Sequence, residues 1–267
     1  MGISCIIPTR DRRELVMAAI ASVRAQDLAV EIVVVDDGSI DDTVARVRDC
    51  FPEVSLTRLG GEGPGAARNA GVAAATNDLL MFLDSDDLWL PGHARALQET
   101  MGRGFAVAYG VTRNRNAVHG GEFCLPGAGE AVEGDCFHAL LRWCFLVPSA
   151  LAMTRQAFVA AGGFGPGLLG EDWAFFLRLA ARLPFGFAGS APISERRLHR
   201  GSLCAMVDRR TILASVRRLG AASRADQAHG YLAVQRFEEM EQWVLRSEEN
   251  WTTVQEWYTA LRRDNMI

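Results

Sequence analysis

The sequence contains no lysine, so its 28 basic residues are all arginines. A chain without lysine cannot form a Schiff base with pyridoxal phosphate. It also cannot contain the P-loop motif, which places a lysine on a nucleotide phosphate. Any phosphate that this chain binds must therefore be held by arginine, by backbone N–H groups or by a metal ion.

Other scarce features narrow the class of protein. No apolar run approaches the roughly 18 residues of a transmembrane helix, and the N-terminus lacks the basic and apolar segments of a secretory signal. A net charge of −4 argues against a nucleic-acid partner. The six cysteines form no C-x-x-C pair and no zinc spacing, which indicates reduced thiols. We therefore expect a cytoplasmic protein.

Short apolar runs alternate with helical patterns over the first 110 residues. Strands are predicted at 4–8, 31–35, 54–58 and 79–83, and helices at 12–26, 40–50 and 66–75. Ser39 is the expected N-cap of the second helix. This alternation predicts an α/β fold, with a mostly parallel central sheet and helices on both faces.

The pattern is less regular after residue 110. The expected helices are 91–103, 131–144 and 171–182, the expected strands are 105–111, 150–153 and 192–199, and a loop or irregular hairpin covers 112–130. From residue 206 the sequence is helical and charged. We therefore predict a main domain at 1–205, with halves 1–110 and 111–205, and a helical C-terminal extension at 206–267.

Polar residues follow three predicted strands at their carboxyl ends, where open α/β sheets bind ligands. They are Thr9, Arg10, Asp11, Asp36, Asp37, Asp84, Asp86 and Asp87. Carboxylates that converge on one crevice repel each other unless a cation lies between them. Mg²⁺ typically binds one or two carboxylates together with substrate phosphates. The alternative, acids that only serve local turns and helix starts, is our interpretation of Asp41 and Asp42.

Four motifs resemble, in order and spacing, those of the family 2 glycosyltransferases, which have the GT-A fold. They are CIIPTRDR at 5–12, VVVDDGS at 33–39, GPGAARNAG at 63–71 and FLDSDD at 82–87. The resemblance continues through GEDW at 170–173 and RLHRGS at 197–202, and so covers roughly residues 2–203. The last 60 or so residues match no motif of the family.

The resemblance implies that residues 1–110 bind a nucleotide diphosphate sugar, most simply a UDP-sugar. The residues that it assigns to this donor are Pro8, Thr9, Arg10, Asp11, Asp36, Asp37, Arg68, Asp84, Ser85, Arg197 and Arg200. Arg10 departs from the family, because many relatives have an aromatic residue there that stacks on uracil. A guanidinium plane can also stack on a base, but the preference for UDP is weakened.

The resemblance also implies the catalytic and metal-binding groups. Asp86 would bind Mn²⁺ or Mg²⁺, and His199 would be a further metal ligand or a phosphate contact. Asp172 matches the catalytic base, and Glu171 would orient the acceptor or Asp172. A carboxylate that deprotonates the acceptor hydroxyl during direct displacement inverts the anomeric configuration. Two acids at a helix start also have a purely local explanation.

Several questions stay open at this level. The acceptor is a glycan, a lipid-linked molecule or a small molecule, bound by the 111–205 half. The basic, amphipathic C-terminal segment fits a solvated face, a homodimer contact or peripheral contact with a membrane. Two alternatives to a metal-dependent inverting glycosyltransferase are a nucleotidyltransferase and a non-catalytic module that binds nucleotide-sugars.

Overall fold

The computed structural model describes residues 1–117, 120–167, 169–199, 201–202, 207–223, 230–247, 249, 251, 254–264 and 266. Among these residues, nine strands form one sheet in the order β3-β2-β1-β4-β8-β6-β9-β5, with β7 paired to β6. The strands are β1 (Ile3–Thr9), β2 (Val30–Asp36), β3 (Ser55–Arg58), β4 (Leu79–Phe82), β5 (Asp87–Trp89), β6 (Val107–Asn116), β7 (Glu122–Leu125), β8 (Leu151–Thr154) and β9 (Phe185–Leu198).

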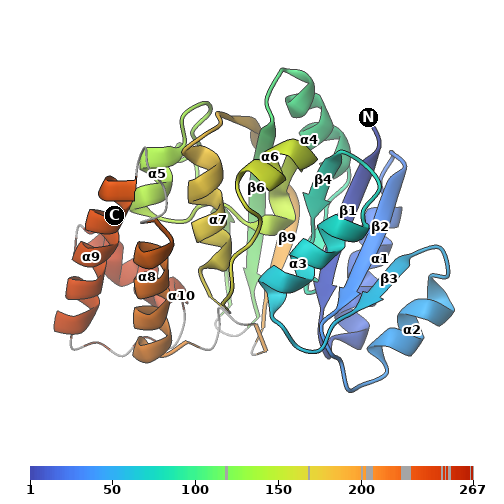
Figure 1. The fold of residues 1–267 in the computed structure, drawn as a ribbon, viewed down its shortest axis with the longest axis horizontal. Helices are drawn as coiled ribbons and strands as arrows, with labels where there is room; N and C mark the ends of the chain where they lie inside the picture. The colour runs from blue at the N-terminus through green and yellow to red at the C-terminus, as the bar shows by residue number, and fades with distance from the viewer. Residues whose placement is uncertain are drawn as a thin grey trace.

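Helices connect the strands and cover both faces of the sheet (Figure 1). They are α1 (Arg13–Arg24), α2 (Thr43–Cys50), α3 (Pro64–Ala74), α4 (His93–Gly102), α5 (Phe137–Arg142), α6 (Arg155–Ala160), α7 (Glu171–Ala180), α8 (Arg209–Ser223), α9 (Gly230–Arg246) and α10 (Val254–Arg263), with a 3₁₀ turn at Pro148–Ala150. The α/β fold predicted from the sequence is confirmed, as is the helical C-terminal region.

The N-terminal part of the sheet is entirely parallel. Strand β1 pairs in parallel with β2 and β4, and β2 pairs in parallel with β3. All seven residues of β1 are buried, which is typical of a strand with helices on both faces. Parallel pairing brings the carboxyl ends of β1, β2 and β4 to one edge of the sheet. The candidate donor residues follow these ends.

The second part of the sheet mixes both orientations. Strand β8 is antiparallel to β4 and β6, while β9 runs parallel to β6 and antiparallel to β5. Strand β9 begins seven residues before the strand predicted at 192–199, and its last residues lie at the same edge of the sheet as the ends of β1 and β4. The short strand β5 and helix α6 were not predicted from the sequence.

Two local predictions are wrong. Helix α2 begins at Thr43, and its N-cap is Asp42 rather than Ser39. The Ser39 hydroxyl instead accepts a hydrogen bond from the backbone N–H of Asp11 (2.8 Å), which ties together the turns after β1 and β2. The helix predicted at 131–144 covers only Phe137–Arg142. Gly134, with φ of 93°, lies outside the helical region and pairs with Phe185 of β9, so the helix begins only after it.

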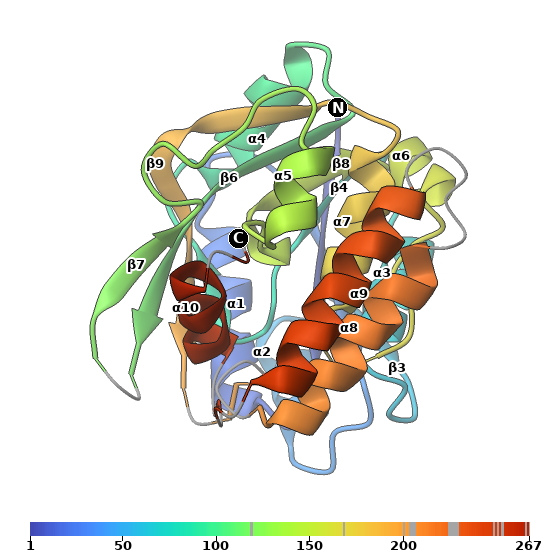
Figure 2. The ribbon, with the colours of Figure 1, turned by 90° about the vertical axis from the view of Figure 1, so that its left-hand side faces the viewer.

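The C-terminal helices belong to the main hydrophobic core. Ile212 and Val216 of α8 and Phe237 of α9 are buried in the same cluster as Trp173 of α7 and Phe137 of α5. Helices α8 and α9 lie side by side, and α10 lies on the side of β7 (Figure 2). No helix in the described part of the chain is both long and apolar enough to cross a membrane.

Candidate active site

A cavity of about 650 Å³ opens at the carboxyl ends of β1 and β4. Its walls come from the turns after β1, β2 and β4, the start of α3, the start of α7 and the end of β9. Segments that are far apart in the sequence therefore meet at one cleft, as expected for an open α/β sheet.

Asp37 holds one end of this cleft together. Its side chain is buried, and its two carboxylate oxygens accept hydrogen bonds from the backbone N–H groups of Glu62 (2.7 Å) and Gly63 (2.8 Å). Gly63 has φ of 96° where the chain turns into α3, a conformation that glycine adopts without strain. Asp37 therefore fixes the glycine-rich turn that forms this wall of the cleft.

Asp86 lies between two cationic or potentially cationic groups. Its carboxylate contacts the guanidinium of Arg12, and His199 Nε2 lies 3.3 Å from Asp86 Oδ2. Burial opposes ionisation of Asp86, but the neighbouring His199 and Arg12 outweigh it and hold its pKa at about 2. Asp86 is therefore an anion that is compensated by positive charge.

Arg68 connects the two halves of the cleft. Its side chain is 5% exposed, and its guanidinium donates to Asp84 Oδ1 (2.6 Å) and to Glu171 Oε1 (3.0 Å). The ring of Phe164 packs against the same guanidinium, 5.1 Å from centroid to Cζ. Arg68 thus joins the turn after β4, which contains the DxD motif Asp84-Ser85-Asp86, to the first turn of α7, where the two candidate catalytic acids lie.

The acids at the start of α7 have raised pKa values. Burial, followed by the charge of Asp172, raises the pKa of Glu171 to about 7, although Arg68 opposes the shift. Burial also raises the pKa of Asp172, against the effects of Arg68 and of the backbone N–H of Trp173, which donates to Asp172 Oδ1 (2.7 Å). A carboxylate with a raised pKa is better suited to accept a proton near neutral pH.

The structure places most of the predicted site residues around the cleft, but not all of them. Those that line it are Pro8, Thr9, Arg10, Asp37, Arg68, Asp84, Ser85, Asp86, Glu171 and Asp172. Asp36 is buried behind the cleft and pairs with Arg58 (3.1 Å). Asp11 accepts from the backbone N–H of Ile40 (2.8 Å), and Arg197 donates to the carbonyl of Asp86 (2.7 Å). Arg200 lies outside the described residues.

Sequence reasoning missed two arginines of the cleft, Arg12 and Arg196. Arg12 belongs to the same motif as Arg10, but nothing in the motif marks Arg12 as a site residue. Only its contact with Asp86 in the folded protein does so. Arg196 and Arg197 are neighbours on β9, where successive side chains point to opposite faces. The sequence could not decide which of them faces the cleft, because the register of β9 was not known.

Comparison with known proteins agrees with this geometry. Residues 4–122 match the family model described as glycosyl transferase family 2. An uncharacterised glycosyltransferase of Nostoc is 33% identical over 168 residues, which cover 58% of this chain and 52% of the relative. A GalNAc(5)-diNAcBac-PP-undecaprenol beta-1,3-glucosyltransferase of Campylobacter jejuni is 33% identical over 114 residues, 40% of this chain and 37% of the relative. The chain thus spans about half or less of the length of these relatives.

Solved structures with the same fold include two that hold a nucleotide-sugar. TarS of S. aureus in complex with UDP-GlcNAc has a TM-score of 0.68 at 19% identity, over 89% of this chain and 72% of that one. The mannosyltransferase PcManGT of Pyrobaculum calidifontis, in complex with GDP-Man and Mn²⁺, has a TM-score of 0.63 at 19% identity, over 91% and 71%. The resemblance seen in the sequence is confirmed: residues 4–122 match the model of glycosyl transferase family 2, and the fold is that of the GT-A glycosyltransferases.

Proposed function

We propose that the protein is a metal-dependent, inverting glycosyltransferase that moves a sugar from a nucleotide diphosphate donor, most simply a UDP-sugar, to an acceptor hydroxyl. The observation that carries this proposal is the single cleft that contains both the DxD turn, with Asp84 and Asp86, and the acid pair Glu171 and Asp172. The complexes of TarS with UDP-GlcNAc and of PcManGT with GDP-Man support a nucleotide-sugar as the donor class.

The donor's base and ribose would occupy the end of the cleft near the glycine-rich turn. Pro8, Thr9 and Arg10 line this end together with Asp37. The Arg10 guanidinium lies beside Gly61, with Nη1 3.4 Å from the position that a Cβ would take. The φ of 96° at Gly61 favours glycine at this position. The Arg10 side chain is 57% exposed, and its guanidinium could stack on a base.

The residues around Asp86 fit a hard divalent cation such as Mn²⁺ or Mg²⁺. Asp86 is ionised and partly buried, and a cation, the guanidinium of Arg12, lies against its carboxylate. The described residues contain no group of three or more His, Cys, Asp or Glu side chains arranged to hold a metal. Asp86 would therefore share the ion with the donor's phosphates, as is common for Mg²⁺. When bound, the ion would neutralise charge on the diphosphate leaving group.

His199 fits the same ion only after a local change. Its Nδ1 accepts a hydrogen bond from the backbone N–H of Gly201 (3.1 Å), so in the neutral ring the proton lies on Nε2, the atom that faces Asp86. Ligation of a metal through Nε2 would require that this proton move to Nδ1. Nδ1 could then no longer accept the hydrogen bond from the backbone N–H of Gly201.

Asp172 would act as the catalytic base. Its raised pKa favours uptake of the proton of the acceptor hydroxyl, and Glu171, held by Arg68, would orient Asp172. The positive end of α7 lies at both carboxylates and stabilises their charged forms while the acceptor is absent. Attack from the face opposite the diphosphate would invert the anomeric carbon.

Two substitutions test the proposal separately. With the donor nucleotide and Mn²⁺ at 100 times Kd, binding should stabilise the wild type by about 2.7 kcal/mol, which is about 5–10 °C in Tm. Asp86→Ala should abolish this shift. Asp172→Asn should keep it and lower turnover by about 10²- to 10⁴-fold. Asp42→Ala is the control, because Asp42 lies outside the cleft and pairs with Arg13 on the surface.

The release of free nucleoside diphosphate, with and without a chelator, decides among the alternatives. Chelator-sensitive release supports a metal-dependent transferase. Binding of the donor without any release would leave a non-catalytic module, and pyrophosphate release from a nucleoside triphosphate would indicate a nucleotidyltransferase. An unchanged shift in Asp86→Ala contradicts the metal assignment, and wild-type turnover in Asp172→Asn contradicts the assignment of the base.

A further inference from the structure

The DxD turn, Asp84 to Asp87, begins where the pairing of β4 with β8 ends. The two strands are antiparallel, and the last pair of their ladder is Met81 with Ala152. The same register, continued beyond this pair, places Asp84 opposite Ser149. At that point, however, the chain forms the 3₁₀ turn that precedes β8 instead of further strand. The ladder between β4 and β8 therefore supplies no acceptor for the backbone N–H of Asp84.

The side chain of Ser149 takes the place of this acceptor. Its hydroxyl oxygen accepts a hydrogen bond from the backbone N–H of Asp84 (3.1 Å), and the hydroxyl donates to Asp87 Oδ2 (2.5 Å). The backbone N–H of Asp87 in turn donates to the carbonyl of Asp84 (2.9 Å). The hydroxyl of Ser149 therefore bridges the two ends of the DxD turn.

This bridge is completely buried. Ser149 is 0% exposed and Asp87 is 1% exposed. A buried carboxyl group is costly unless it is hydrogen-bonded, and Asp87 Oδ1 has no hydrogen-bond partner among the described residues. The placement of the Asp87 side chain therefore depends strongly on the hydroxyl of Ser149.

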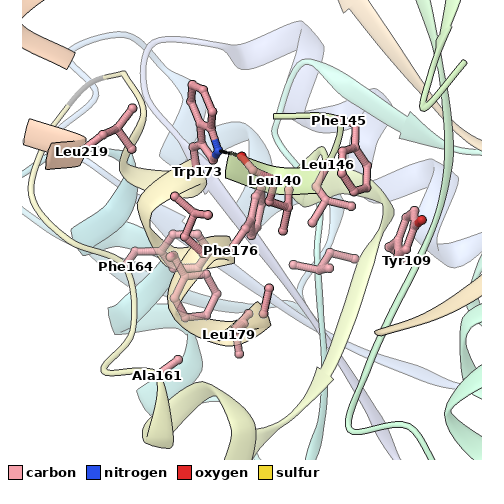
Figure 3. Close-up of a cluster of buried hydrophobic side chains, with 14 of the residues drawn as sticks. Tyr109, Leu140, Phe145, Leu146, Ala161, Phe164, Trp173, Phe176, Leu179 and Leu219 are labelled. Atoms are coloured by element: carbon pink, nitrogen blue, oxygen red, sulfur yellow. Dashed lines mark hydrogen bonds between the residues drawn. The ribbon is translucent and has the colours of Figure 1, made fainter. Parts of the chain in front are cut away.

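The hydrophobic core fixes the position of Ser149. Phe145 and Leu146, which precede it, are buried in the main hydrophobic cluster together with Tyr109 (Figure 3). The rings of Tyr109 and Phe145 lie 5.8 Å apart. Pro148, whose φ is restricted by its ring, begins the 3₁₀ turn, and β8 follows directly. Ser149 therefore holds the DxD turn from a rigid part of the molecule.

The bridge has a consequence for the three acids of the turn. The carboxyl group of Asp87 is buried against Ser149, whereas the side chains of Asp84 and Asp86 are 26% and 15% exposed and line the cleft. Arg197 holds the turn at another point, because its Nε donates to the carbonyl of Asp86 (2.7 Å). The backbone from which Asp84 and Asp86 project is thus fixed by side chains that come from outside the turn.

Resting on the proposed function, we propose that Ser149 is a positioning residue of the donor site. Its hydroxyl fixes the DxD turn so that the carboxylates of Asp84 and Asp86 reach the donor and its metal ion together. Ser149 does not line the cleft, so it acts only through the turn. It also lies outside every sequence motif on which the resemblance to the family rests.

The test compares Ser149→Ala with the matched control Ser4→Ala. Ser4 is equally buried, at the amino end of β1, away from the cleft. Its hydroxyl likewise donates to a carboxylate, that of Glu31, and accepts from a backbone N–H, that of Asn77 (3.2 Å). Because the two substitutions remove similar hydrogen bonds, both variants should lose stability, seen as a lower Tm. Only Ser149→Ala should also bind the donor nucleotide less tightly.

Binding is measured by isothermal titration calorimetry of the full chain with Mn²⁺ and UDP, or GDP if the wild type binds it more tightly. We expect binding to weaken about 5- to 20-fold in Ser149→Ala and to stay unchanged in Ser4→Ala. Ser149→Cys is a second variant in case Ser149→Ala does not fold. A thiol is a weak hydrogen-bond donor and acceptor, so Ser149→Cys should weaken binding by a smaller factor.

The inference is overturned if a folded Ser149→Ala or Ser149→Cys protein binds the nucleotide with Mn²⁺ as tightly as the wild type does. It is also overturned if Ser4→Ala weakens binding as much as Ser149→Ala, because the effect would then follow from lost stability alone. A wild-type protein that binds neither UDP nor GDP with Mn²⁺ would instead contradict the proposed function.

Discussion

Arg68 offers the sharpest test of how the cleft is held together. It is a buried arginine between two carboxylates, with side-chain exposures of 5% for Arg68, 26% for Asp84 and 6% for Glu171. Arg68→Met keeps an unbranched side chain of similar length but removes the charged guanidinium, which hydrogen-bonds to both carboxylates and packs on Phe164. The substitution leaves Glu171 buried without its cation, a change that typically costs about 3–5 kcal/mol.

The expected loss depends on pH. The pKa of Glu171 is about 7 in the presence of Arg68, and without this cation it rises further. Glu171 in Arg68→Met is therefore protonated in weak acid, and a neutral carboxyl has little need of the arginine. We expect a loss of about 3 kcal/mol at pH 8, or about 6–12 °C in Tm, and a clearly smaller loss at pH 5.5.

The assay is thermal or urea unfolding of the wild type and the variant at both pH values. Arg95→Met is the matched control, because Arg95 pairs with Asp27 at 2.6 Å with both side chains about half exposed. Surface pairs of this kind contribute less than about 1 kcal/mol. A loss in Arg68→Met no larger than that in Arg95→Met, or one that is equal at both pH values, would refute the reasoning.

Glu171 and Arg12 give two more predictions. The pKa of Glu171 is about 7 in the folded protein and about 4.5 in the unfolded chain, so the folded state binds more protons than the unfolded state between these pH values. The free energy of unfolding should therefore fall by up to roughly 3 kcal/mol as the pH rises from 4.5 to 7. In Glu171→Gln this part of the pH dependence should be absent. Parallel plots of the free energy of unfolding against pH for the wild type and the variant would contradict the prediction. Arg12→Ala removes the cation that competes for Asp86, so Mn²⁺ should bind about tenfold tighter by electron paramagnetic resonance. Arg13→Ala should leave Mn²⁺ binding unchanged, and weaker binding in Arg12→Ala would show that Arg12 assists the metal.

Much of the first half of the fold could be predicted from the sequence. Strands β1, β2 and β4 are short apolar runs followed directly by polar turns, and this pattern is local. The second half was predicted less well. Gly134 interrupts the helix expected at 131–144 because it pairs with Phe185, about 50 residues away. No local pattern reveals such a pairing.

The residues of the candidate site were likewise predicted only in part. The sequence identified the acids after β1, β2 and β4, because they follow strands whose carboxyl ends meet at one edge. It did not distinguish Asp37, which lines the cleft, from Asp36, which is buried behind it. Adjacent residues at a strand end face opposite sides, and only the packed sheet shows which side is the cleft.

The sequence by itself determined the order of strands and helices from β1 to β4, the family motifs, and the absence of any lysine to bind phosphate. These properties depend on residue type and on spacing along the chain. The tertiary structure alone decided that Arg68 joins Asp84 to Glu171, that Arg12 lies on Asp86, and that α10 lines a cavity beside Asp172. Each of these contacts joins segments that are distant in sequence, and their meeting depends on how the whole core packs.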